Sequence, residues 1–164
     1  MKVNDEAREK LLNEVTDLTE SELNWKSSED KWSVGQVLEH LYLMEGGIVK
    51  TIQTQLSKGK PHVTPDKPIE RTVDRSTKVE VPDFARPGDA FYTLEQLKEK
   101  LESSHNGLKQ IETMVPEDQL AAKSFPHPVF GDMNLAQYIP FVGYHELRHI
   151  DQIKEVKESM IAKK

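Results

Sequence analysis

Three of the six histidines stand where they could bind one metal ion together. His145 and His149 are four residues apart in a segment with helical periodicity, so their side chains share one face of a helix. His40 lies in another helical segment, on the same side as Met44 of its apolar stripe. Neutral imidazole is a good ligand for Zn²⁺, Ni²⁺ or Fe²⁺, and three protein ligands leave a coordination position open. The histidines therefore predict a site for one divalent ion, with a hydrogen-bonded core histidine as the alternative for each.

The string from His145 to His149 also reads H-E-x-x-H, the motif of zinc peptidases in which the glutamate is the general base. Such peptidases take their third ligand downstream, but the residues from Asp151 to Glu155 read D-Q-I-K-E and lack the G-x-x-H continuation. A metallopeptidase is therefore only a remote alternative. Glu146 falls near the apolar stripe, where it could act as a base or bond to a neighbouring helix.

Two glutamines share the faces that carry the histidines. Gln36 lies one turn before His40, and Gln152 lies three residues after His149. Either amide could orient a ligand or contact substrate. The alternatives are a capping side chain for Gln36 and a solvated one for Gln152. Both, with Glu146, are candidates for a catalytic role.

The remaining histidines carry weaker expectations. His105 sits near the core face of the third helical segment, where a structural role is expected, and it is the one of these three that could approach the metal. His62 lies in a proline-rich stretch and is expected to be solvated. His127 precedes Pro128 and is expected to shape the turn into the fourth helical segment.

Four amphipathic helical segments must position these side chains. They span residues 4–23, 33–56, 93–115 and 134–156. The residues placed to cap them are Asn4, Ser33, Thr93 and Asn134. Ser33 with Gln36, and Thr93 with Gln96, form S/T-x-x-Q capping boxes. Pro140 lies inside the last apolar pattern and predicts a kink there.

The second and third helical segments are separated by a long irregular stretch. Residues 58–90 hold five of the nine prolines, which predicts a loop with at most a short extended piece over 78–81. Little else in the sequence favours strands. The expected fold is all-α, a four-helix bundle with a long connection between helices 2 and 3, in one domain over residues 1–164.

Composition narrows the classes of function. The chain has 164 residues with 22 Lys and Arg against 28 Asp and Glu, and a net charge of −6 argues against nucleic acid as a partner. Cysteine is absent, which excludes disulfides, thiolate catalysis and Cys-ligated zinc. No apolar run approaches the roughly 18 residues needed to span a bilayer, so no membrane association and a cytoplasmic location are expected.

Three stretches together resemble the motifs of the DinB-like superfamily. They are K-W-S-V-G-Q-V-L-E-H-L over residues 31–41, H-P-V-F-G-D-M-N over 127–134, and H-E-L-R-H-I-D-Q-I over 145–153. The resemblance implies a four-helix bundle whose single divalent metal is held by His40, His145 and His149. It also implies a homodimer, which apolar residues left over on the first and third helical segments would favour.

The resemblance leaves the reaction open. Characterised members include S-transferases that use bacillithiol, mycothiol or glutathione and a maleylpyruvate isomerase, and others are described as metal-dependent hydrolases. We therefore expect a thiol S-transferase or hydrolase acting on a small electrophilic molecule through zinc or nickel, with a low-molecular-weight thiol as a candidate cosubstrate. A non-catalytic metal-binding or stress-associated protein is the alternative.

Overall fold

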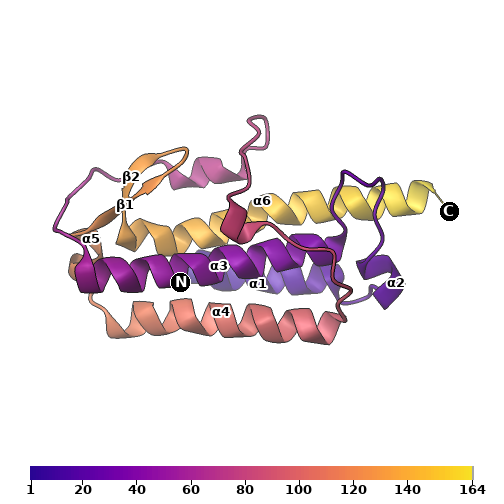
Figure 1. Cartoon of the computed structure of the whole chain (residues 1–164), viewed down its shortest axis with the longest axis horizontal. Coiled ribbons are helices and arrows are strands. Elements are labelled where there is room, and N and C mark those ends of the chain that lie inside the picture. Colours follow the sequence, from indigo (N-terminus) through magenta and orange to yellow (C-terminus); the bar gives the residue numbers. More distant parts are fainter. Residues whose placement is uncertain (164) are drawn as a thin grey trace.

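Four long helices lie side by side along the longest axis of the molecule in the computed structural model, which describes residues 1–163 (Figure 1). They are α1 (Lys2–Val15), α3 (Val34–Lys58), α4 (Leu94–Met114) and α6 (Leu135–Ala162). Helix α1 packs mainly on α6, and α4 packs mainly on α3. The predicted all-α four-helix bundle is confirmed.

Shorter elements join the long helices. They are α2 (Glu20–Leu23), the 3₁₀ turns η1 (Ile69–Val73) and η2 (Asp83–Ala85), α5 (Glu117–Ala121), β1 (Ser124–His127) and β2 (Gly131–Asn134). The strands form an antiparallel hairpin that the sequence did not predict. Gly131 has a φ of 71°, a conformation that favours glycine, and begins the second strand.

Helix starts follow the predicted capping residues in three cases. Ser33 and Thr93 each accept a hydrogen bond from the backbone N–H three residues on, in complete capping boxes, and Asn134 caps α6. Helix α1 instead begins at Lys2, and Asn4 is a fully buried helical residue whose side-chain amide donates to the carbonyl of Ile139.

The first and last long helices differ from the predicted segments. The expected segment 4–23 is interrupted, because α1 ends at Val15 and a separate capping box at Thr19 begins α2. Helix α6 runs without interruption through Pro140. Pro140 has no N–H to donate to the carbonyl four residues back, so α6 lacks one backbone hydrogen bond in its second turn.

Two apolar clusters fill the bundle, one toward each end, and neither includes a histidine. Of the large apolar residues in α1 and α4, Met114 alone is mostly exposed, and Val3, Leu12 and Leu94 are half-buried. No helix among the described residues is long and apolar enough to cross a membrane.

The long connection between α3 and α4 crosses the outside of the bundle above α6 and α3 (Figure 1). Its turn η1 packs on α6, and its turn η2 packs on α3. The loop prediction is therefore correct, although residues 78–81 form no strand.

Candidate metal centre

Three imidazole rings from α3 and α6 converge inside the bundle. The Nε2 atom of His145 lies 3.2 Å from Nε2 of His40 and 3.2 Å from Nε2 of His149. One ring nitrogen from each of the three lies within 4.8 Å of the other two. The i, i+4 spacing on α6 and the apolar stripe of α3 bring these rings together as predicted.

Two of the rings are held by hydrogen bonds at their other nitrogen. Nδ1 of His40 lies 2.7 Å from the carbonyl oxygen of Ala85 in η2, and a carbonyl can only accept. Nδ1 of His149 lies 2.7 Å from Oε1 of Gln152. Both Nδ1 atoms therefore carry the proton, which leaves the Nε2 lone pairs of His40 and His149 free to face His145.

The separations fit a shared ion. Two nitrogens each about 2.1 Å from one tetrahedral Zn²⁺ lie roughly 3.4 Å apart, close to the 3.2 Å found for both pairs. Without an ion, Nε2 of His145 faces the lone pairs of two other Nε2 atoms and carries at most one proton to donate. The donor set therefore suits a divalent cation.

Burial keeps these imidazoles neutral. It lowers the pKa of His40, and it lowers the pKa of His145 well below the usual value, an effect that the neighbouring His149 increases. Burial also lowers the pKa of His149 to about 3, with further effect from His40. Neutral imidazole is the form that binds a metal.

The surroundings of the site are aromatic, and of the three histidines only His149 is partly exposed. The ring centroid of Trp32 lies 5.1 Å from that of His40, and the centroid of Phe141 lies 5.8 Å from that of His145. His40 is 2% exposed and His145 is 7% exposed. The turn η2 supplies part of this cover through Ala85.

Arg148, next to His149 in the chain, fixes the long connection beside the middle of α6. Its guanidinium donates to the carbonyl oxygens of Thr72, Asp74 and Thr77 at 3.0, 2.5 and 2.9 Å. Three backbone acceptors on one side chain hold this stretch of loop beside the histidines.

The two glutamine candidates have different roles. Gln152 orients His149, which is one of the roles expected for it. Gln36 accepts from the backbone N–H of Ser33 in the capping box and donates to the carbonyl of Gly88. The capping alternative is therefore confirmed for Gln36, which also holds the long connection.

Glu146 and His105 belong to a second polar cluster and contact different partners from the three histidines. Arg8 of α1 forms buried ion pairs with Glu146 at 2.6 Å and with Glu45 at 3.0 Å. His105 lies 2.9 Å from Asp5 and 3.5 Å from Glu45. His105 therefore has a structural role and does not approach the three histidines, and Glu146 bonds to a neighbouring helix.

The two glutamates of this cluster have pKa values that are shifted in opposite directions. Burial raises the pKa of Glu146 to about 7, although Arg8 opposes the shift. Hydrogen bonds and the charge of Arg8 outweigh burial at Glu45 and lower its pKa. Because the glutamate of H-E-x-x-H is paired with Arg8, the arrangement does not support the peptidase alternative.

The other two histidines behave as expected. His62 is exposed and lies 3.3 Å from Asp132. His127 accepts from the backbone N–H groups of Val129 and Phe130 through Nδ1 and so shapes the hairpin turn. Burial lowers the pKa of His127 to about 4.

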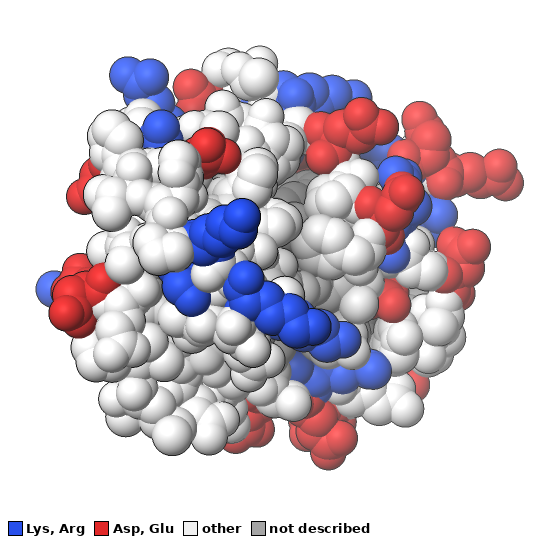
Figure 2. Space-filling model, turned by 60° about the vertical axis from the view of Figure 1, so that its left-hand side comes forward, with Lys and Arg blue, Asp and Glu red and all other residues white. Residues whose placement is uncertain are grey.

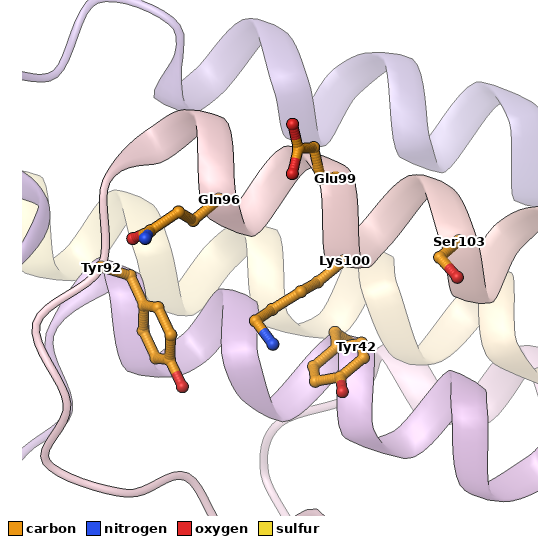
Figure 3. A pocket seen from close by; sticks show the side chains of 6 residues that line it. All are labelled: Tyr42, Tyr92, Gln96, Glu99, Lys100 and Ser103. Atoms are coloured by element: carbon orange, nitrogen blue, oxygen red, sulfur yellow. The ribbon is translucent and has the colours of Figure 1, made fainter.

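A separate surface hollow of about 500 Å³ lies between α3 and α4. Its lining residues are Tyr42, Tyr92, Gln96, Glu99, Lys100 and Ser103, and Figure 3 shows the lysine reaching between the two tyrosines. The Lys100 ammonium lies 4.9 Å from the ring centroid of Tyr42 and 5.7 Å from that of Tyr92. No histidine lines this hollow.

Charge is unevenly distributed over the surface. On the face shown in Figure 2, Lys and Arg side chains gather near the middle among uncharged residues, and Asp and Glu lie mostly around the rim. The net charge of −6 therefore does not describe every face of the molecule.

Solved structures share this fold. The chain matches TT2238, a four-helix bundle protein, with a TM-score of 0.64 at 18% identity over 94% of each chain. It also matches YfiT from Bacillus subtilis, described as a probable metal-dependent hydrolase with an unusual four-helix bundle topology. That match has a TM-score of 0.65 at 20% identity over 97% of this chain and 84% of YfiT.

Sequence comparison identifies the family. The uncharacterized protein YuaE of Bacillus subtilis (strain 168) is 31% identical over 160 residues, which cover 98% of each chain. Residues 4–153, which include all three converging histidines, match the family model of the DinB superfamily. The chain therefore belongs to the DinB superfamily.

Proposed function

We propose that this protein is a metal-dependent enzyme in which His40, His145 and His149 hold one divalent ion, zinc or nickel. The observation that carries the proposal is the convergence of three Nε2 atoms, two of which have their lone pairs freed by hydrogen bonds at Nδ1. The description of YfiT as a probable metal-dependent hydrolase supports it by analogy.

The chemistry follows from the type of ligand. Three neutral imidazoles leave the charge of the cation uncompensated, unlike a set that includes carboxylates. A divalent ion held there would lower the pKa of a water or thiol that reaches it and so supply a nucleophile at neutral pH. Trp32 and Phe141 would exclude bulk water around the histidines.

Two reactions suit such a nucleophile: hydrolysis of a small electrophile, and transfer of a thiol to it. The chain contains no cysteine, so the thiol of an S-transferase would have to come from a low-molecular-weight cosubstrate. A homodimer, which rests on the family resemblance, and a cytoplasmic location are also part of this proposal.

A non-catalytic metal-binding protein is the second candidate. The burial of His40 and His145 favours it, because a substrate must reach the ion for catalysis. The Zn²⁺-loaded and Ni²⁺-loaded proteins should therefore be assayed with ester, amide and epoxide electrophiles, alone and with each of bacillithiol, mycothiol and glutathione. The matched control is His145→Ala.

The outcomes separate the candidates. Turnover that needs the metal and is lost in His145→Ala supports the enzyme, and dependence on a thiol distinguishes transfer from hydrolysis. Stoichiometric metal binding without turnover of any electrophile supports the non-catalytic candidate instead.

A further inference from the structure

The turn η2 contributes a backbone group to the metal centre. Ala85 is fully buried, and its carbonyl oxygen accepts the Nδ1 proton of His40 at 2.7 Å. Its own N–H donates to the carbonyl of Pro82 at 3.0 Å. The position of this carbonyl depends on how η2 sits on α3.

Phe84, the residue before Ala85, shows how η2 is placed on α3. Its ring lies directly against the α-carbon of Gly47, so that a Cβ added there would come within 2.3 and 2.7 Å of two ring carbons. Gly47 is seven residues after His40 in α3, and residues seven apart share a helix face. The ring of Phe84 therefore contacts α3 two turns beyond His40, and the carbonyl of the following residue, Ala85, binds the imidazole of His40.

The residues just after η2 are fastened to the same helix. The N–H of Gly88 donates to Oε2 of Glu39 at 3.2 Å, and the carbonyl of Gly88 accepts from Nε2 of Gln36 at 2.9 Å. Glu39 directly precedes His40. Residues 82–88, which we term the strap, therefore contact α3 on both sides of the histidine.

From these contacts we infer that Gly47 and Phe84 are positioning residues for the metal centre. Gly47 leaves the space that the Phe84 ring occupies, the seated ring places the carbonyl of Ala85, and that carbonyl fixes the tautomer of His40. The inference rests on the proposed metal site. Groups that orient a metal-binding histidine commonly change metal affinity about 10–100-fold when lost.

Adjacent glycines provide the matched control. A Cβ on Gly46 meets nothing within 4 Å, whereas one on Gly47 meets the Phe84 ring. Alanine and leucine at either position change the helix propensity of α3 by similar amounts. Any difference between substitutions at Gly46 and at Gly47 therefore reports on the packing of the strap against α3.

The first experiment measures Zn²⁺ affinity by competition with a chromophoric chelator. Gly47→Leu is expected to weaken binding about tenfold or more, and Gly47→Ala by less, because the exposed ring of Phe84 can rotate away from a single methyl group. Gly46→Ala and Gly46→Leu are expected to bind as the wild type does. Equal affinities at the two positions would overturn the inference.

The second experiment measures hydrogen exchange of the strap amides without metal. Gly47→Leu is expected to speed exchange at Ala85 and Gly88 relative to Gly46→Leu. If Gly47→Leu fails to fold, Phe84→Ala tests the same contact and is expected to speed the same amides. Unchanged exchange in the folded variants would contradict the seating of the strap.

Failure of the proposed function gives a different pattern. If the wild type binds no Zn²⁺ while Gly47→Leu still speeds strap exchange, the metal site is refuted and its link to the strap falls with it. If the wild type binds Zn²⁺ and Gly47→Leu binds it equally well, the metal site stands and the positioning role is refuted. Since coupling is reciprocal, Zn²⁺ should also slow strap exchange in the wild type.

Discussion

Arg8 and Glu146 join α1 to α6 through a buried ion pair of 2.6 Å, one residue away in the chain from His145. The same guanidinium donates to the carbonyl of Leu101 in α4 and pairs with Glu45 in α3. A single side chain thus links all four long helices. This gives the H-E-x-x-H glutamate a structural partner, separate from the three histidines.

Removing Arg8 should therefore destabilise the fold. Arg8→Ala leaves two buried carboxylates without their partner, and breaking a buried pair in this way costs about 3–5 kcal/mol. Urea unfolding at neutral pH measures the loss. Lys10→Ala, at an exposed position of α1, should change the unfolding free energy by less than about 0.5 kcal/mol. Equal effects of the two substitutions would refute this role of Arg8.

His105 should make stability depend on pH. The carboxylate of Glu45, 3.5 Å away, and the hydrogen bond to Asp5 raise the pKa of His105 above the unfolded value, against the effects of burial and of Arg8. The protonated ring therefore stabilises the fold below the unfolded pKa of about 6.5, and this is lost as pH rises through the folded pKa. His105→Gln should lower the unfolding free energy more at pH 5.5 than at pH 9. The opposite order would contradict the assignment.

Gln152 should matter for metal affinity and little for folding. Gln152→Ala removes the acceptor that holds Nδ1 of His149, and a loss of Zn²⁺ affinity of about tenfold is expected. Gln152→Glu keeps an acceptor and should restore binding. Gln110→Ala, on the exposed face of α4, controls for the change in helix propensity. If Gln152→Ala binds Zn²⁺ as tightly as that control does, the amide has no orienting role.

The bundle should survive the loss of the metal centre. Neither apolar cluster contains the three histidines, and three of the long helices carry side-chain caps of their own. Replacing His40, His145 and His149 with Gln should leave helical circular dichroism and a cooperative thermal melt, with a lower midpoint than the Zn²⁺-loaded wild type. An unfolded spectrum would indicate a structural metal.

Much of this arrangement could be predicted because side-chain patterns encode it. Capping boxes marked the starts of two long helices, and the spacing of His145 and His149 marked their shared face. The burial of two polar residues of α1 also had a signal in the sequence, the helical spacing, and our predictions missed it. Asn4, Arg8, Leu11 and Val15 recur at helical spacing, so Asn4 and Arg8 had to face the core.

Three features of the structure had no such signal in the sequence: the acceptor for His40, the partners of His105 and the hairpin. The acceptor for His40 is the backbone carbonyl of Ala85, and any residue type supplies a carbonyl. The possibility that His105 approaches the metal could not be decided from the sequence, because a position near a core face does not tell which of two polar clusters the residue joins. The hairpin was missed because its strands are four residues long, and β1 contains a proline.

The stoichiometry of metal in the purified full chain tests the central claim most directly. The chain is dialysed against Zn²⁺, freed of excess ion and measured for metal content alongside the single variants His40→Gln, His145→Gln and His149→Gln. Our account predicts close to one ion per chain in the wild type and a large loss in each variant. A wild type that holds no ion, or variants that keep their full content, would contradict it.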